Sequence, residues 1–492
     1  MNIPEIKLGI VAVSRDCFPM DLSRERSRAV LSAYETRGGT AFLAPTIVEN
    51  EKDAMKALEE IRGAGVNALV VYLGNFGPEG PETILAQKFS GPVMFAAAAE
   101  ENVAVLSNRR GDALCGLLSA SYNLKLRHLK VFIPERPVGT AEEVAGMMEE
   151  FVPVSRILIG VKKLKIFTFG PRPQDFFACN APIQGLYDLG VEIQENSELD
   201  LFVSYRDHEK DPRIPAVVAE MTDELGAGNR YAGILERLAA LELTLLDWKE
   251  QNLGASEYCV FANKCWPAFQ TEFKCVPCYV NSRLASRLIP VACEVDVYGA
   301  LSEYILACAT MAPPTILDIN NSVPKELYDT EIGPVSSYRQ GETFMGFHCG
   351  NTPSCMVRDP KMSYQLIMKR SLEPDGEPDI TRGTLEGDLK PGKVTFFRLH
   401  STADCHLISY VAQGEVLPAT THSFGSIGVI AIPEMERFYS HVLVENGFPH
   451  HGGLGFAHVG KTLFSALRLL GVDKIGYNQP RGILYSSENP FA

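Results

Sequence analysis

Apolar, strand-like runs alternate with helix-like segments along the first third of the chain. The strand-like runs cover residues 6–14, 38–46, 66–76 and 92–99, and the segments between them have apolar residues three and four positions apart. The runs are apolar at nearly every position rather than at every second one. Such runs are typical of parallel strands, because helices cover both faces of a parallel sheet. The pattern predicts a doubly wound α/β domain.

The same alternation restarts at Leu164. Strand-like segments at residues 164–170, 191–196 and 198–205 precede a long helical stretch, and this order indicates a second doubly wound, parallel-sheet domain. We expect the first α/β domain to span residues 1–163 and the second to span residues 164–313.

The pattern changes again after residue 313. Strands that alternate apolar and polar residues, such as 393–401, 406–417 and 425–433, are separated by polar turns. This spacing is typical of an antiparallel barrel or sandwich. We therefore expect residues 314–492 to form a β-rich C-terminal domain that completes a site begun in the second domain.

The charge balance argues against two classes of partner. The 492 residues include 46 Lys and Arg against 60 Asp and Glu, so the formal net charge is −14, and no basic run is present. Nucleic acid and anionic membranes are therefore unexpected partners. No secretory signal or membrane-spanning run is visible, which predicts a cytoplasmic protein, and the twelve cysteines are expected to be reduced.

Two acidic residues lie in apolar surroundings within residues 289–321. Glu294 follows a strand-like run, and Asp318 ends the next strand-like run after a helix-like segment. A strand, a crossover helix and a strand would leave both carboxylates at the carboxyl edge of one sheet. Buried carboxylates must be paired or bound to metal. We interpret them as metal ligands and acid/base groups, although helix capping or a salt bridge is the common alternative.

Histidines further along the chain could complete such a site. His348 lies in a Gly-Asn loop, and His450 and His451 precede two glycines. Two carboxylates with one or two imidazoles suit Mn²⁺ or a similar divalent cation. Only one ring of an adjacent pair can point into a site, and a structural role for His348 stays open.

Other positions could contact a sugar. Arg15 directly follows the first strand, and Trp266 lies close to Gln270, so that an aromatic face and an amide could both meet a sugar ring. Asn351 and His450 are further candidates. A surface salt bridge for Arg15 and a core position for Trp266 are the alternatives. No nucleotide-binding glycine motif lies between a strand and a helix, and no serine-hydrolase motif is present.

Several motifs follow one another along the chain: SRDCFP, KIFTFGPRPQDF, ACEVDVYGA, ILDINN, MGFHCGN, PGKVTFFRL and PHHGGLGFAHVG. In this order they resemble motifs of the L-fucose and L-arabinose isomerases, which are metal-dependent aldose–ketose isomerases. The resemblance covers essentially the whole chain.

The resemblance implies a site and an assembly. Glu294, Asp318 and His451 match the fucose isomerase ligands of Mn²⁺ or of another divalent cation such as Co²⁺ or Mg²⁺, and His348 resembles an additional ligand of the arabinose enzymes. The subunit would form a hexamer or trimer whose first domain, with Arg15, closes over a neighbour's site.

The expected reaction is isomerisation of a free, or deoxy, sugar through an enediol, with one carboxylate as base and the other as acid. Either carboxylate could take either role. An isomerase of a sulfonated or phosphorylated hexose and a non-catalytic sugar-binding protein are the alternatives.

Overall fold

The computed structural model describes residues 1–491, which form two compact units. The N-terminal unit contains Pro4–Ile159 together with Ser465–Gly471. The larger unit contains Met1–Ile3, Gly160–Phe464 and the chain from Val472 onward. Each unit is described by itself below.

A five-stranded parallel sheet forms the centre of the N-terminal unit. Its strands are β1 (Leu8–Val13), β2 (Ala41–Leu43), β3 (Ala68–Leu73), β4 (Val93–Ala98) and β5 (Val138–Gly139), in the order β2-β1-β3-β4-β5. Every residue of β1, β3 and β4 is buried, as the uninterrupted apolar runs predict.

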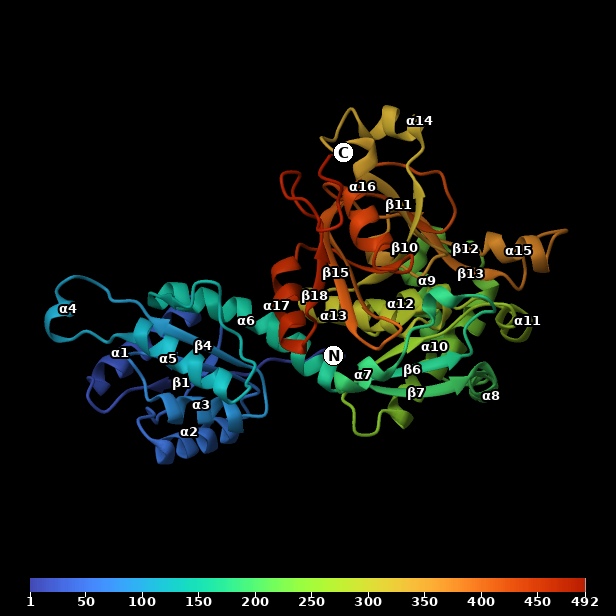
Figure 1. Cartoon of the computed structure of the whole chain (residues 1–492). Helices are drawn as coiled ribbons and strands as arrows, with labels where there is room; N and C mark the ends of the chain where they lie inside the picture. Colours follow the sequence, from blue (N-terminus) through green and yellow to red (C-terminus); the bar gives the residue numbers. More distant parts are fainter. Residues whose placement is uncertain (492) are drawn as a thin grey trace. The chain divides into compact units, whose positions relative to one another are not determined.

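Helices pack around this sheet (Figure 1). They are α1 (Met20–Thr36), α2 (Glu51–Gly63), α3 (Glu79–Lys88), α5 (Ala113–Leu126) and the start of α6 (Ala141–Lys162). The short helix α4 (Val105–Asn108) lies in the loop between β4 and α5 (Figure 1). Asn50 caps α2 by accepting hydrogen bonds from the backbone N–H groups of Lys52 and Asp53.

The larger unit contains a second parallel sheet and a closed barrel. The sheet consists of β6 (Leu164–Gly170), β7 (Glu192–Ser197), β8 (Tyr258–Ala262) and β9 (Val291–Ala292), in the order β7-β6-β8-β9. Its helices are α7 (Gln184–Asp188), α8 (Glu198–His208), α9 (Ile214–Leu225), α10 (Leu235–Asn252), α11 (Phe269–Phe273), α12 (Cys278–Ser286) and α13 (Val297–Thr310).

One strand expected in this region is a helix. Residues 198–205 form the start of α8 instead of a strand. Ser197 and Asp200 form a reciprocal capping box, which satisfies backbone N–H groups at the helix start. This local signal outweighs the strand-like spacing of the apolar residues.

Six antiparallel strands close into the barrel. They are β10 (Thr315–Ser322), β11 (Thr343–His348), β14 (Gly392–Ser401), β15 (Leu407–Leu417), β16 (Ser426–Ala431) and β17 (His451–Gly455). The order β16-β11-β10-β17-β14-β15 returns to β16, because β15 also pairs with β16. Three strands extend this sheet: β12 (Lys361–Tyr364), β13 (Arg382–Asp388) and β18 (Lys474–Tyr477).

The remaining helices are α14 (Lys325–Leu327), α15 (Leu366–Leu372), α16 (Met435–Phe438) and α17 (Gly460–Leu470). Two parallel-sheet α/β regions followed by an antiparallel barrel confirm the predicted fold class. The strands β6 and β10 begin at Leu164 and Thr315, and the exact domain limits of 163 and 313 stay predictions.

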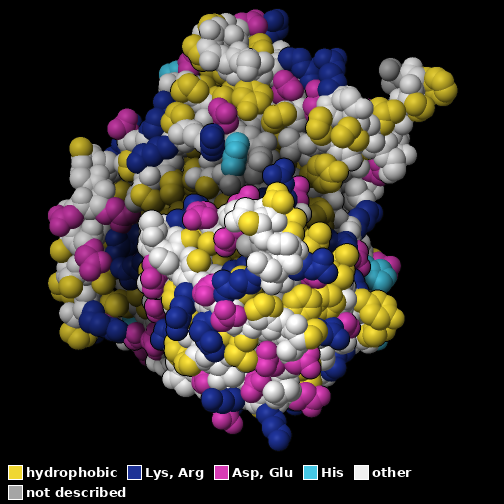
Figure 2. Space-filling model, turned by 90° about the vertical axis from the view of Figure 1, so that its left-hand side faces the viewer, with side chains coloured by type: hydrophobic (Ala, Val, Ile, Leu, Met, Phe, Trp, Pro, Cys, Tyr) yellow, Lys and Arg dark blue, Asp and Glu magenta, His cyan; other side chains and the backbone are white. Residues whose placement is uncertain are grey.

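The surface carries charges of both signs. On the face drawn in Figure 2, Lys and Arg side chains are interspersed with Asp and Glu and with patches of hydrophobic side chains. Within residues 1–491, none of the helices combines the length and the apolar character that crossing a bilayer requires.

Candidate functional site

The two carboxylates come from different sheets. Glu294 follows β9 of the parallel sheet, whereas Asp318 lies within β10 of the barrel. The expectation that both lie at the edge of one sheet is therefore wrong. The helix α13 leads the chain out of the parallel sheet and into the barrel, so that the two elements meet at the site.

Local backbone geometry brings Glu294 and His451 to Asp318. Glu294 lies in a tight turn, Cys293–Val295, with a left-handed φ of 60°. His451 begins β17 and is the cross-strand partner of Asp318 in the antiparallel β10–β17 pair. Directly opposed residues of such a pair have adjacent side chains. The barrel register therefore places this histidine beside this carboxylate.

Three buried atoms without a hydrogen-bond partner converge at this point. The Nε2 atom of His451 lies 2.9 Å from Oε2 of Glu294 and 3.3 Å from Oδ1 of Asp318. All three atoms are buried, and none has a partner in hydrogen-bond geometry within the described chain. Adjacent ligands of a cation bound at ~2.1 Å are about 3 Å apart. The two distances to Nε2 are thus those of neighbouring ligands of a divalent cation. Among the described residues, two groups that could hold a metal share His451: one contains Cys179 and Glu294, and the other contains Asp318 and His348.

A buried ion pair lies behind the histidine. The Nδ1 atom of His451 is 2.9 Å from Oδ2 of Asp296, and both side chains are 1% exposed. Arg398 of β14, which is fully buried, donates to both oxygens of Asp296 over 2.7 and 2.9 Å. Burial alone would raise the pKa of Asp296, but Arg398 and His451 hold it well below its usual value.

This arrangement fixes the ring of His451. A permanently ionised Asp296 accepts the hydrogen of Nδ1, so that Nε2 faces the two other carboxylates. Asp296 also caps α13 by accepting from the N–H of Gly299 over 2.9 Å. Sequence analysis missed Asp296 and Arg398 as site residues, although both lie inside the motifs ACEVDVYGA and PGKVTFFRL.

The electrostatic environment of His451 favours a positive charge. Its burial by itself would lower the pKa, but the contacts with Asp296, Asp318, Cys179 and Glu294 raise it well above its usual value. Metal binding at Nε2 would displace the proton that this environment favours.

A loop after β6 adds a sulfur atom and aromatic rings. The Sγ atom of Cys179 lies 3.6 Å from Nδ1 of His451. The ring of Phe176 lies 5.5 Å from His450 and 6.4 Å from Trp266, measured between ring centroids. Trp266 is half-buried. Phe176 therefore lies between the ring of Trp266 on one side and the histidine pair on the other.

The other two predicted histidines also lie here. A ring nitrogen of His348 lies within 4.8 Å of candidate ligand atoms of Asp318 and His451. Burial lowers the pKa of His348, so the ring is neutral at neutral pH. His450 is 36% exposed, with Nε2 3.8 Å from Oδ1 of Asp318, and burial lowers its pKa as well.

No contact with the ligand atoms of Glu294, Asp318 or His451 is described for the remaining predicted sugar-binding residues, Gln270, Asn351 and Arg15. Gln270 is buried and donates to Gln365 over 2.9 Å. Asn351 is 3% exposed, and its Oδ1 has no partner within residues 1–491. Arg15 belongs to the N-terminal unit, where its guanidinium lies 5.0 Å from the ring centroid of Phe76.

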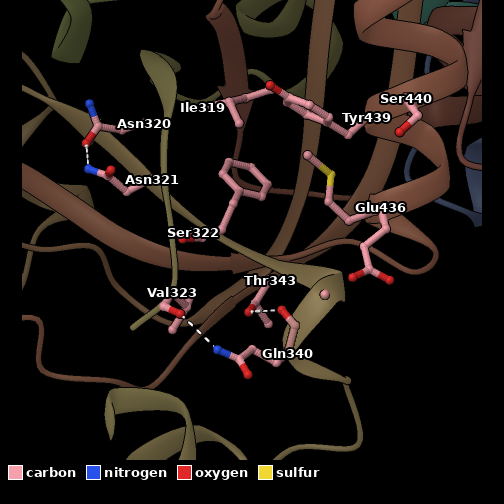
Figure 3. A pocket seen from close by; sticks show the side chains of 13 residues that line it. Ile319, Asn320, Asn321, Ser322, Val323, Gln340, Thr343, Glu436, Tyr439 and Ser440 are labelled. Carbon is pink, nitrogen blue, oxygen red and sulfur yellow. Dashed lines mark hydrogen bonds between the residues drawn. The ribbon is translucent and has the colours of Figure 1, made fainter. Parts of the chain in front are cut away.

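A large cavity lies elsewhere on the barrel (Figure 3). It has a volume of about 740 Å³ and is lined by Ile319, Asn320, Asn321, Ser322, Val323, Gln340, Gly341, Thr343, Phe344, Met435, Glu436, Tyr439 and Ser440. Several of its polar groups bond one another: Asn321 donates to Asn320, and Gln340 donates to the carbonyl of Val323. Neither Glu294 nor Asp318 lines this cavity, so it is separate from the site around His451.

Comparisons with known proteins match both ends of the chain. A family model described as fucose/sulfoquinovose isomerase, N-terminal domain, matches residues 9–162. A second, described as L-fucose isomerase, C-terminal domain, matches residues 346–477. The second match contains His348 and His451, whereas Glu294 and Asp318 lie between the two matches.

Similar proteins from three bacteria carry one name. A sulfoquinovose isomerase from Priestia megaterium is 21% identical over 470 residues, which cover 94% of this chain and 97% of that protein. One from Alkalicoccus urumqiensis is 25% identical over 338 residues, covering 67% and 69%. One from a Clostridium species is 28% identical over 296 residues, covering 59% of each. The similarity to the Priestia protein therefore extends over nearly the full length of both chains.

Proposed function

The chain belongs to the fucose isomerase-like family of aldose–ketose isomerases, and we propose that Glu294, Asp318 and His451 form its catalytic metal centre. The observation that carries this proposal is that Oε2 of Glu294 and Oδ1 of Asp318 both lie within 3.3 Å of Nε2 of His451. All three atoms are buried, and none has a hydrogen-bond partner among the described residues. One divalent cation bound to all three atoms would give each of them a partner. Two carboxylates and an imidazole suit Mn²⁺, with Co²⁺ or Mg²⁺ as other occupants.

The reaction requires a proton to leave C2 and a proton to arrive at C1. A divalent cation held by these three residues supplies Lewis-acid stabilisation of the enediolate charge when it is bound. Glu294 and Asp318 both lie within 3.3 Å of His451 Nε2 and would transfer these protons. The ring of Phe176, 5.5 Å from that of His450, would limit access of water on that side.

We propose an anionic hexose, sulfoquinovose, as the substrate. Two observations support this choice: the curated relatives share that name, and the N-terminal family model includes it. A homo-oligomer, as a hexamer or trimer in which Arg15 contacts a sugar, is part of the same proposal.

The test measures isomerisation of sulfoquinovose, glucose and L-fucose after EDTA treatment, with and without added Mn²⁺, Co²⁺ or Mg²⁺. We expect EDTA to abolish activity, Mn²⁺ to restore it, and sulfoquinovose to give the highest kcat/KM. Glu294→Gln removes one ligand and one proton-transfer group while keeping the side-chain volume, and we expect a loss of at least about 10³-fold in kcat.

The matched control is Glu257→Gln, which changes an exposed glutamate paired with Lys163. This variant should keep full activity. Sugar binding without conversion, unchanged in Glu294→Gln and independent of metal, would contradict the proposal and favour a sugar-binding protein. A preference for L-fucose would contradict only the choice of substrate.

A further inference from the structure

The two buried histidines at the centre use their Nδ1 atoms in opposite ways. In His451, Nδ1 faces the ionised Asp296 carboxylate over 2.9 Å, so Nδ1 carries a hydrogen. In His348, Nδ1 accepts the backbone N–H of Cys349 over 2.9 Å. A backbone amide can only donate, so the lone pair of His348 Nδ1 is already used.

This hydrogen bond selects the tautomer of His348. The side chain is 4% exposed. Because Nδ1 accepts a hydrogen bond, it carries no hydrogen, and the ring is therefore not the doubly protonated imidazolium. A neutral imidazole whose Nδ1 accepts a hydrogen bond carries its single hydrogen on Nε2. Both nitrogens are then unsuited to a metal: one lone pair is taken by Cys349, and the other nitrogen is protonated.

We propose that His348 is a hydrogen-bond donor to an oxygen of the sugar and not a metal ligand. This inference rests on the proposed isomerase function. A ring nitrogen of His348 lies within 4.8 Å of ligand atoms of Asp318 and His451, and its ring centroid is 5.8 Å from that of His451. The ring of His348 therefore lies beside the proposed cation position, where a sugar oxygen would gain negative charge during enolisation.

The different partners of Nδ1 thus give the two histidines different tasks. Asp296 directs the lone pair of His451 Nε2 towards the carboxylates, which suits a ligand. Cys349 leaves His348 with an Nε2–H group, which suits a donor. Removing a donor aimed at developing negative charge typically lowers kcat by about 10² to 10³-fold.

The test compares His348→Ala, His348→Gln and His348→Asn with His451→Gln. The amide nitrogen of Gln reaches the position of Nε2, whereas that of Asn reaches only the position of Nδ1. We measure the Kd of Mn²⁺ by titration and the isomerase kinetics at saturating Mn²⁺, with circular dichroism as the folding control.

We expect the three His348 variants to keep the Mn²⁺ affinity of the wild-type protein, while His451→Gln weakens it by at least about 100-fold. His348→Ala and His348→Asn should lose about 10² to 10³-fold in kcat, and His348→Gln should recover much of that loss. If His348→Ala misfolds, the comparison of Gln with Asn still separates the two roles.

Three results would overturn the inference. A weakening of Mn²⁺ binding in the His348 variants as large as in His451→Gln would make His348 a ligand. Unchanged kcat in all three His348 variants would remove its contact with the sugar. A wild-type protein that neither binds Mn²⁺ nor isomerises any sugar would overturn the proposed function as well, whereas the first two results leave that function intact.

Discussion

At the scale of single residues, the fully buried pair of Asp296 and Arg398 determines how His451 is presented. Breaking a buried ion pair by neutralising one partner leaves an unpaired charge and typically costs about 3–5 kcal/mol. Here the same carboxylate also holds the imidazole, because His451 Nδ1 lies 2.9 Å from it. The Asp296 side chain therefore contributes both to the stability of the fold and to the affinity for metal. Variants of Asp296 and Arg398 can distinguish the two contributions.

We predict that Asp296→Asn weakens Mn²⁺ binding by about 10- to 100-fold, because an amide neither fixes the histidine ring nor raises its basicity as a carboxylate does. The variant should also be less stable, since Arg398 loses its counter-charge. Urea unfolding and Mn²⁺ titration measure the two effects.

The double variant Asp296→Asn with Arg398→Gln serves as the control. Removing both charges should restore much of the stability, because neutral pairs in the same volume are often tolerated. The Mn²⁺ affinity should stay low. Recovery of metal affinity together with stability would show that Asp296 acts on folding alone and would contradict the positioning role.

The sequence contains the residues of this site but not their pairing. Glu294 and Asp318 could be selected because carboxylates interrupt apolar segments, whereas the choice of His451 over His450 also needed the family resemblance. Asp296 and Arg398 are 102 residues apart, and no local pattern links them. Gln270 likewise pairs with a distant residue that no local pattern indicates: its buried amide donates a hydrogen bond to Gln365.

At the scale of elements, strand β17 must approach the barrel core closely for His451 to oppose Asp318. Gly452, the next residue, has no room for a side chain, because an added Cβ would overlap the ring of Phe396 and the hydroxyl group of Tyr410. The missing Cβ therefore allows the β10–β17 pairing that builds the site.

We predict that Gly452→Ala destabilises the protein by about 1–3 kcal/mol and weakens Mn²⁺ binding, because overpacking shifts the backbone that carries His451. Gly482→Ala is the matched control, since nothing lies within 4 Å of its added Cβ. Thermal unfolding and Mn²⁺ titration of both variants check the prediction. Equal behaviour of the two variants would show that β17 has more freedom than its packing indicates.

The sequence predicts whether a segment is a helix or a strand where a run of apolar residues is long. It predicts this less well where a short capping motif competes with the spacing of the apolar residues. The buried strands β1, β3 and β4 follow from their uninterrupted apolar runs. The helix α8 was missed because Leu199, Leu201 and Val203 alternate as in a strand, while the Ser197–Asp200 capping box starts a helix. The strand order of the barrel depends on pairing between distant segments, such as β10 with β17 and β14 with β17, and these pairings have no local signature.

At the scale of the whole molecule, the proposed centre lies inside the larger of the two compact units. Its ligands come from the turn after β9 and from the barrel strands β10 and β17, all within that unit. The N-terminal unit has its own five-stranded sheet and buried core. A cation that binds the three ligands therefore joins the parallel-sheet region to the barrel.

We predict that Mn²⁺ stabilises the larger unit selectively. A ligand that binds only the folded state at 100 times its Kd adds about 2.7 kcal/mol of stability. Hydrogen exchange followed by mass spectrometry should show increased protection in peptides from Cys293–Val295, β10 and β17, with little change in peptides from residues 4–159. Glu294→Gln should abolish the increase because one of the three ligands is lost. Equal protection of peptides from both units, or an unchanged response in Glu294→Gln, would show that Mn²⁺ binds elsewhere and would contradict the location of the centre.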